Sequence, residues 1–259
     1  MIKIIFIISI LLVFTLPNNI FAEEIFTTVS HDTDDIVYDG LWSFLFEWKR
    51  TSEDKIRYDD GKLMAIKTAH DYENLYVLVD VISDKTPSPM ADRGMICIDS
   101  KADKTVHADD DDYCFLTSLK AKNPITLNGG TQFIQNANFK KVDNHSEFKA
   151  VGGISNGTDR YSKIPHTTYE FKIPLEVFGK SHEYGFFVQA YDYNENRFYN
   201  WPKNSTSEKY PFIPSPNQWG SLISPDKSIP EFGFPLVILM FILGPVFLAK
   251  FGIRLFVRF

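Results

Sequence analysis

Short apolar runs separated by polar breaks occupy most of the chain, and helical periodicity is scarce. Runs of four to eight such residues predict β-strands, because strand side chains alternate between two faces and buried strands are apolar on both. We expect strands at 62–67, 75–81, 93–99, 113–118, 132–135, 167–173, 184–191, 197–201 and 219–223, and two more within the Asn/Gly-rich segment 123–157. The pattern predicts an all-β fold, an antiparallel β-sandwich of jelly-roll-like form.

Two neighbouring pairs of these strands have a defined local arrangement. The polar turn Asp71-Tyr-Glu-Asn74 joins the runs 62–67 and 75–81, which predicts a β-hairpin. Cys97 and Cys114 lie in runs joined by a single loop, so the two strands should be antiparallel neighbours. Cysteines facing each other across such a pair can form a disulfide, as an even cysteine count in an oxidising compartment suggests; two buried free thiols are the alternative.

The two ends of the chain differ from this pattern. Residues 1–22 combine a basic start, an apolar core and Ala22 before two glutamates, the features of a secretory signal peptide; an uncleaved N-terminal anchor is the alternative. Residues 232–249 carry no charge and are long enough for a transmembrane helix; a buried C-terminal helix is the alternative. The basic tail 250–259 predicts a cytoplasmic C-terminus.

The middle of the chain is therefore expected to be exported and to lie at the cell membrane or the outer cell surface. Residues 23–224 should form the sandwich, and residues 225–231 a linker. Acidic residues outnumber basic ones 33 to 27. The charged residues of the two end segments are all basic, so the exported part is more acidic than the whole chain. This charge argues against nucleic acid as a partner and favours divalent cations. Asn144, Asn156 and Asn204 stand in N-glycosylation sequons.

The residues Pro230, Glu231, Phe232 and Gly233 directly precede the apolar span. The order of motif, span and basic cluster resembles the C-terminal sorting signals read by exosortases and archaeosortases, in the PEFG form found in ammonia-oxidising archaea. The resemblance implies a sortase-like transpeptidase that cuts near the motif and replaces the span with another anchor. A plain membrane anchor is the alternative.

A series of short motifs runs through the predicted sandwich in a fixed order: YDGLW at 38–42, NLYVLVD at 74–80, Asp92, ICID at 96–99, YEFKIPL at 169–175, GFFVQAYD at 185–192, WP at 201–202 and WGSL at 219–222. The series resembles family 9 carbohydrate-binding modules and their DOMON-like relatives. The resemblance implies a β-sandwich that binds a polysaccharide or other glycan between aromatic faces, often with structural calcium. The chain departs from the family by having Pro89-Met-Ala91 where an aromatic residue often precedes Asp92.

Candidate ligand-binding residues follow from the chemistry of sugars, whose apolar faces stack on aromatic rings while carboxylates bind their hydroxyls. The candidates are Trp42, Trp48, Tyr191, Asp192, Tyr193 and Trp201. Trp42, Trp201 and Trp219 also match framework positions, for which packing in the core is the favoured alternative, whereas Trp48 matches none and is expected to be more exposed.

Candidate metal ligands are carboxylates, because calcium prefers oxygen. The run His107-Ala-Asp-Asp-Asp-Asp-Tyr113 supplies Asp109, Asp110, Asp111 and Asp112, and Asp84, Asp92 and Asp99 could add ligands from neighbouring strands. A solvated acidic loop without a metal is the alternative.

Motifs for nucleophilic catalysis, zinc proteolysis and phosphate binding are absent from the sequence. We therefore expect no enzyme activity, although the many carboxylates leave glycoside hydrolysis open. Two other hypotheses remain. One is a structural envelope or S-layer-associated protein without a ligand. The other is an electron carrier whose haem is held by Met90 or Met95 with His70 or His107.

Overall fold

The computed structural model describes residues 23–30, 33–130, 139–208 and 211–225. The predicted signal peptide, the strand at 132–135, the PEFG motif, the membrane span and the basic tail lie outside these ranges. Within them, none of the helices has the length and hydrophobicity needed to cross a membrane.

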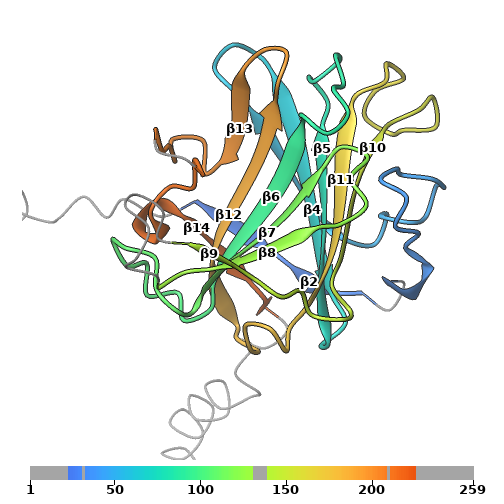
Figure 1. Cartoon of the computed structure of the whole chain (residues 1–259). Coiled ribbons are helices and arrows are strands. Elements are labelled where there is room, and N and C mark those ends of the chain that lie inside the picture. The colour runs from blue at the N-terminus through green and yellow to red at the C-terminus, as the bar shows by residue number, and fades with distance from the viewer. Residues whose placement is uncertain (1–22, 31–32, 131–138, 209–210, 226–259) are drawn as a thin grey trace, which may run out of the picture.

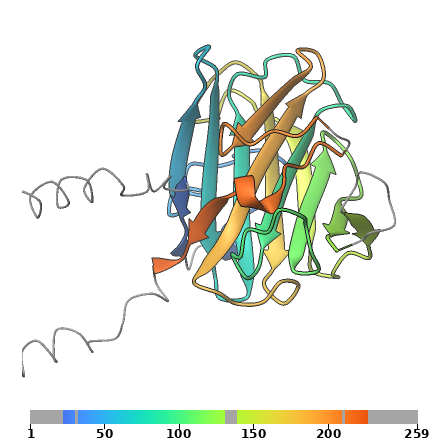
Figure 2. The same ribbon diagram turned by 90° about the vertical axis from the view of Figure 1, so that its left-hand side faces the viewer.

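Two β-sheets stacked face to face make up the described chain (Figures 1 and 2). Sheet A has the order β1-β14-β12-β6-β7-β8-β9, with β13 beside β12. Its strands are β1 (Glu24–Phe26), β6 (Arg93–Asp99), β7 (Asp112–Ser118), β8 (Ile125–Asn128), β9 (Lys140–Val142), β12 (Glu183–Asp192), β13 (Arg197–Trp201) and β14 (Gly220–Ile223). Sheet B has the order β10-β11-β5-β4-β2, with β3 beside β4. Its strands are β2 (Thr28–Val29), β3 (Ser52–Arg57), β4 (Leu63–His70), β5 (Asn74–Val81), β10 (Lys149–Ile154) and β11 (Thr167–Pro174).

The predicted sandwich and hairpin are confirmed. Strands β4 and β5 pair antiparallel with Ala65 opposite Asp80, and the turn between them begins at Asp71. Asp71 Oδ1 accepts hydrogen bonds from the backbone N–H groups of Glu73 and Asn74, which closes the turn. The described residues otherwise contain only two short 3-10 helices, η1 (Thr33–Asp35) and η2 (Pro216–Gln218).

The N-terminal segment joins the two sheets, which the hydrophobic pattern did not predict. Strand β1 pairs in parallel with β14 in sheet A, and β2 pairs in parallel with β4 in sheet B. The chain changes sheets at the buried residue Thr27 between them. Strand β1 has three residues and β2 has two, too few to show a period, so only their partners define them.

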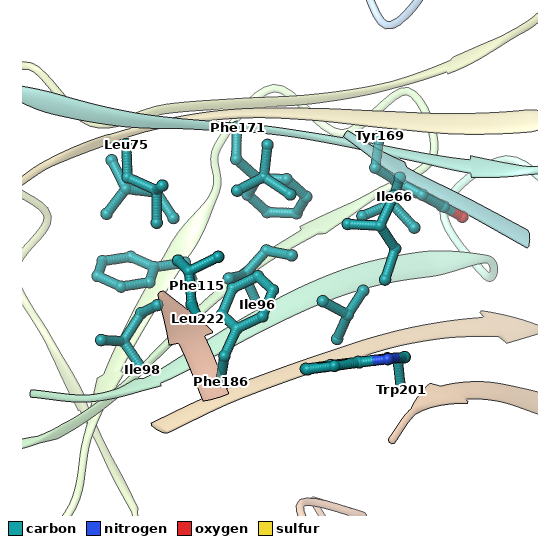
Figure 3. Close-up of a cluster of buried hydrophobic side chains, with 14 of the residues drawn as sticks. Ile66, Leu75, Ile96, Ile98, Phe115, Tyr169, Phe171, Phe186, Trp201 and Leu222 are labelled. Carbon is teal, nitrogen blue, oxygen red and sulfur yellow. The ribbon is translucent and has the colours of Figure 1, made fainter. Parts of the chain in front are cut away.

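The core between the sheets consists of aliphatic and aromatic side chains from both layers, including Ile66, Leu75, Ile96, Phe171 and Phe186 (Figure 3). All five are at most 2% exposed. Burial of this apolar area is the main source of the fold's stability, at about 25 cal/mol per Å².

Each sheet also carries a smaller apolar cluster on its outer face. The disulfide between Cys97 and Cys114 lies in the cluster on sheet A, which also contains Phe187 and Trp219. The two cysteines are direct partners in the antiparallel pair β6–β7, as the sequence predicts. The cluster on sheet B is formed by residues 36–48 packing on Tyr76 and Leu78.

Candidate functional site

Three carboxylates meet at one end of the sandwich interior. Asp84 follows β5, Asp92 directly precedes β6, and Asp192 ends β12. Each is at most 1% exposed, and each offers an oxygen atom that lies within 4.8 Å of the others. Asp92 and Asp192 point inward because they continue the alternation that buries Ile96 and Ala190. Three segments distant in sequence therefore converge on what we call the carboxylate cluster.

Hydrogen bonds hold the cluster in place. Asp84 Oδ2 accepts from Thr167 Oγ1 at 2.8 Å, and Asp92 Oδ1 accepts from the backbone N–H of Tyr193 at 2.9 Å. Asp192 Oδ1 accepts from the backbone N–H of Glu195 at 3.0 Å, while Asp192 Oδ2 is buried without a hydrogen-bond partner. An orphaned buried oxygen of this kind is costly unless another ligand satisfies it.

The electrostatics of the cluster are unfavourable without a cation. Burial raises the pKa of Asp84 to about 6, and the charges of Asp192 and Asp92 add to the rise. Burial and the charge of Asp192 likewise raise the pKa of Asp92. Among the described residues, no Lys, Arg or His side chain forms an ion pair with any of the three.

The donor set fits a hard cation such as calcium. All three side chains supply oxygen, the ligand type that calcium takes at about 2.3–2.6 Å. The hydroxyl groups of Tyr169 and Tyr199 are also buried without a hydrogen-bond partner, and the negative charges of the cluster raise the pKa of Tyr169 further above the value that burial imposes. The cluster thus includes two predicted metal ligands, Asp84 and Asp92, together with the predicted sugar ligand Asp192.

The other predicted metal ligands lie at the opposite end of β6. Asp92 directly precedes the seven-residue strand β6 and Asp99 ends it, so the two residues are about 23 Å apart and cannot share one ion. Asp99 instead neighbours Asp103 and Asp111, while Asp109, Asp110 and Asp111 form a second group.

This second region is partly neutralised and mixes exposed with buried carboxylates, because Asp99, Asp111 and Asp112 are at most 8% exposed. Lys101 Nζ lies 2.8 Å from Asp111 Oδ1, and Asp110 is exposed. Asp112 Oδ2 accepts a hydrogen bond from the backbone N–H of Asp109. Local pairing accounts for part of this region, but Asp112 Oδ1 is buried without a hydrogen-bond partner, so a metal at these carboxylates stays a prediction.

The predicted tryptophan ligands are enclosed by protein. Trp42 and Trp201 are each 4% exposed, and Trp48, which was expected to be the more exposed, is fully buried. Trp48 is enclosed because its Nε1–H donates to Glu170 Oε1 at 2.9 Å, and Glu170 Oε2 accepts from the backbone N–H of Gly40 at 2.8 Å. The buried carboxylate thereby holds the 36–48 segment against sheet B, and none of these three indoles offers a face to a sugar.

The predicted tyrosines lie at the surface next to the carboxylate cluster. Tyr193 is 59% exposed in the turn after β12, and Tyr191 is half-buried on the outer face of sheet A. Tyr191 pairs with Phe198 of β13, and their ring centroids are 4.7 Å apart. Phe212 follows at 5.3 Å from Phe198. On the other side of Tyr191, the Arg93 guanidinium lies 4.7 Å from the ring centroid.

These four half-buried residues, Arg93, Tyr191, Phe198 and Phe212, form what we call the aromatic row. The register of β6, β12 and β13 produces it, because partners in antiparallel strands place their side chains on the same face. The carbonyl of Phe212 accepts a hydrogen bond from Gln189 Nε2, which ties the 211–213 segment to the sheet. Sequence reasoning singled out only Tyr191 of this row, since Arg93, Phe198 and Phe212 are far apart along the chain.

A polar cleft of about 510 Å³ adjoins the row at Phe198. Its lining comes from the β3–β4 turn and from β13 and the residues after it: Tyr58, Asp59, Asp60, Arg197, Phe198, Lys203 and Asn204. Arg197 and Asp60 form a bidentate ion pair across it. The row and the cleft together offer stacking faces beside hydrogen-bonding groups.

The three sequon asparagines, Asn144, Asn156 and Asn204, are all exposed, and Asn204 lines the polar cleft. The methionine and histidine residues considered as haem ligands do not lie together in the fold. Met95 is buried in the apolar cluster on sheet A, whereas His70 is in sheet B with Nε2 at 2.9 Å from Ser224 Oγ.

No protein-family model and no curated protein matches the chain. Among solved structures, the chain is similar to a carbohydrate binding module family 9 (CBM9) from Caldicellulosiruptor kristjanssonii in complex with cellotriose, and to the same module in complex with glucose. Both are 15% identical with a TM-score of 0.49, and the match covers 78% of this chain and 93% and 95% of the two modules.

Proposed function

We propose that the chain is a non-catalytic glycan-binding protein displayed at the cell surface, with calcium in the carboxylate cluster. The observation that carries the proposal is the aromatic row leading into the polar cleft. Stacked rings bind the apolar faces of sugars, and the cleft's carboxylates and amide can bind hydroxyl groups.

Calcium has a positional role in this proposal. Asp92 is next to Arg93, and Asp192 lies between Tyr191 and Tyr193. The β5–β6 loop also contacts the β12–β13 turn, because the side chain of Asn194 donates hydrogen bonds to the carbonyl of Thr86 and the hydroxyl of Ser88. An ion bound by the three aspartates would therefore hold the β5–β6 loop and the β12–β13 turn in one arrangement. Glycan binding should then depend on calcium.

Retention on immobilised polysaccharides tests the proposal. The full chain, purified in mild detergent, is passed over a panel of insoluble and immobilised glycans with calcium present. We expect retention on at least one glycan, and loss of that retention in Phe198→Ala. Tyr72→Ala is the control, because Tyr72 is 47% exposed in the β4–β5 turn, outside the row. The proposal is contradicted if the wild-type chain binds no glycan, or if Phe198→Ala binds as well as the control Tyr72→Ala.

Surface display rests on the sequence alone, through the signal peptide, the span and the PEFG motif. Mass spectrometry of the C-terminal peptide from native membranes tests the sorting signal. A new C-terminus near Pro230 supports processing by a transpeptidase, and an intact span up to Phe259 supports a plain anchor.

One observation favours the second candidate, a structural envelope protein. Phe44, Leu45 and Phe46 are 39%, 59% and 58% exposed at the tip of one loop. Exposed contiguous apolar residues are typical of protein interaction sites. Concentration-dependent self-association that Leu45→Asp abolishes, in a protein that binds no glycan, would favour this function.

A further inference from the structure

A second buried cluster lies on the outer side of sheet B. His166 directly precedes β11, Asp80 is in β5, and Asp159 is in the loop between β10 and β11. His166 is fully buried, Asp80 is 1% exposed and Asp159 is 8% exposed. One ligand atom from each lies within 4.8 Å of the other two.

The contacts within this cluster differ from those of an ordinary hydrogen-bonded histidine. His166 Nε2 lies 2.7 Å from Asp80 Oδ1 and 3.8 Å from Asp159 Oδ1. The short approach to Asp80 nevertheless lacks hydrogen-bond alignment, and both atoms are without a hydrogen-bond partner. A contact of this kind is either an ion pair between an imidazolium and a carboxylate or a pair of ligands of one metal ion.

The other ring nitrogen fixes the tautomer. His166 Nδ1 lies 2.8 Å from the carbonyl oxygen of Ile164, which can only accept a hydrogen bond. The hydrogen is therefore on Nδ1, and in the neutral ring the lone pair of Nε2 faces the two aspartates. A histidine that binds a metal characteristically donates its second N–H to a backbone carbonyl in this way.

Unsatisfied oxygens provide an independent sign of a ligand. Asp80 Oδ2 and Asp159 Oδ2 are both buried without a hydrogen-bond partner. Among the described residues, His166 is also the only basic side chain within ion-pair distance of either aspartate. A divalent cation would satisfy both oxygens and the imidazole together.

A nucleophilic role for the neighbouring Ser155 does not fit the geometry. Ser155 Oγ lies 2.8 Å from His166 Nδ1, and this serine is only 3% exposed. Its hydroxyl also accepts the backbone N–H of His166 at 3.0 Å. The hydroxyl is thus enclosed and serves to orient the imidazole.

We propose that Asp80, Asp159 and His166 form a structural site for a first-row divalent transition metal, with Zn²⁺ as the natural occupant. One imidazole with two carboxylates suits Zn²⁺ and its neighbours, whereas the all-oxygen cluster at Asp84 suits Ca²⁺. The burial of all three ligands makes the site structural. The metal would pin the loop of residues 155–166 to sheet B.

Metal titration of the full chain in mild detergent tests the site. Saturating Ca²⁺ is added first, and Zn²⁺ is then titrated against a chromophoric chelator. We expect about one equivalent of Zn²⁺ that Ca²⁺ does not displace. Asp159→Asn and His166→Gln should lower the Zn²⁺ affinity by about tenfold or more. Asp84→Asn is the matched control and should keep the Zn²⁺ while losing a Ca²⁺.

Spectroscopy of the wild-type chain decides the matter even if the variants do not fold. Co²⁺ should give visible ligand-field bands, and Zn²⁺ X-ray absorption should show one imidazole among oxygen ligands. Absence of Zn²⁺ uptake, an oxygen-only shell, or uptake unchanged in folded Asp159→Asn and His166→Gln would overturn the proposal. The cluster would then be a proton-sharing network. Glycan binding is read separately, so either proposal can fail alone.

Discussion

The backbone N–H of Tyr193 donates a hydrogen bond of 2.9 Å to Asp92 Oδ1, although the two residues are 101 positions apart. This contact joins an exposed aromatic residue in the β12–β13 turn to a carboxylate at the start of β6. Whatever stabilises the carboxylate cluster therefore also stabilises the turn that carries Tyr193.

Calcium should raise the stability of the wild-type chain and not that of Asp192→Asn. Calcium at about one hundred times its dissociation constant is expected to add about 2.7 kcal/mol to the free energy of unfolding. Without calcium the variant should be as stable as the wild type or more so, because one of three repelling charges is gone. Thermal unfolding with calcium and with chelator measures this. Asp110→Asn, at an exposed carboxylate, should respond like the wild type, and a wild type insensitive to calcium contradicts the site.

The pH dependence of stability should contain a contribution from Glu170. Burial raises the pKa of this carboxyl group to about 8; the hydrogen bonds from Trp48 and Gly40 oppose the rise, and the charges of Glu47 and Asp39 add to it. The folded chain therefore keeps a proton that the unfolded chain loses near its ordinary pKa of 4.5. Between these two values stability falls as pH rises, and above the folded pKa the contribution is constant.

Glu170→Gln should flatten this part of the profile. Denaturation of the variant and the wild type at about pH 5 and about pH 9 gives the difference, which we expect to be a few kcal/mol at most. Glu73→Gln, at an exposed glutamate, should leave the wild-type slope unchanged. A slope that is the same in Glu170→Gln and the wild type would show that Glu170 is ionised throughout.

Gly94→Ala should destabilise the sandwich by overpacking. A Cβ atom at Gly94 would lie 2.5 Å from Cγ of Tyr169, which is closer than a van der Waals contact and belongs to a fully buried ring. Insertion of a methyl group into such a site costs about 1–3 kcal/mol. Chemical denaturation measures the loss. Gly157→Ala is the control, since a Cβ there meets no atom within 4 Å, and an equal loss in both variants would contradict the steric argument.

Reduction of the disulfide should lower stability without changing the fold. The bond joins cysteines 17 residues apart, and a loop of about this length is worth about 3 kcal/mol in the unfolded state. Denaturation of the double variant Cys97→Ala, Cys114→Ala measures the cost, with circular dichroism to confirm the strands. No loss of stability would show that the thiols are free in the native chain.

Glycosylation of Asn204 should compete with glycan binding, whereas glycosylation of Asn144 should not. Asn204 lines the polar cleft, and Asn144 instead bonds to the carbonyl oxygen of Pro124, away from the cleft residues. Expression in a glycosylating host, compared with Asn204→Gln and Asn144→Gln, gives the affinity of each form. Equal binding by all forms would place the glycan site elsewhere.

The sequence by itself determined most of the strands. The apolar runs at 75–81 and 93–99 correspond closely to β5 and β6, because strands buried on both faces are marked by continuous apolar residues. The antiparallel pairing of Cys97 and Cys114 also followed from local information, since one loop connects their strands. The short strands β1 and β2 were not predicted, because two or three residues carry no period, and neither was β3, whose residues Ser52–Arg57 are mostly polar. The segment 123–157, in which two strands were expected, contains three: β8, β9 and β10.

Only the tertiary structure decided which residues meet. Asp84, Asp92 and Asp192 belong to three separate segments, and strand register rather than sequence spacing brings them together. The same register separates Asp92 from Asp99 and places Phe198 beside Tyr191. Burial was equally nonlocal, since Trp48 is enclosed by its bond to Glu170, which is 122 residues away. A sequence shows which groups can bind a ligand, but their convergence and exposure depend on long-range packing.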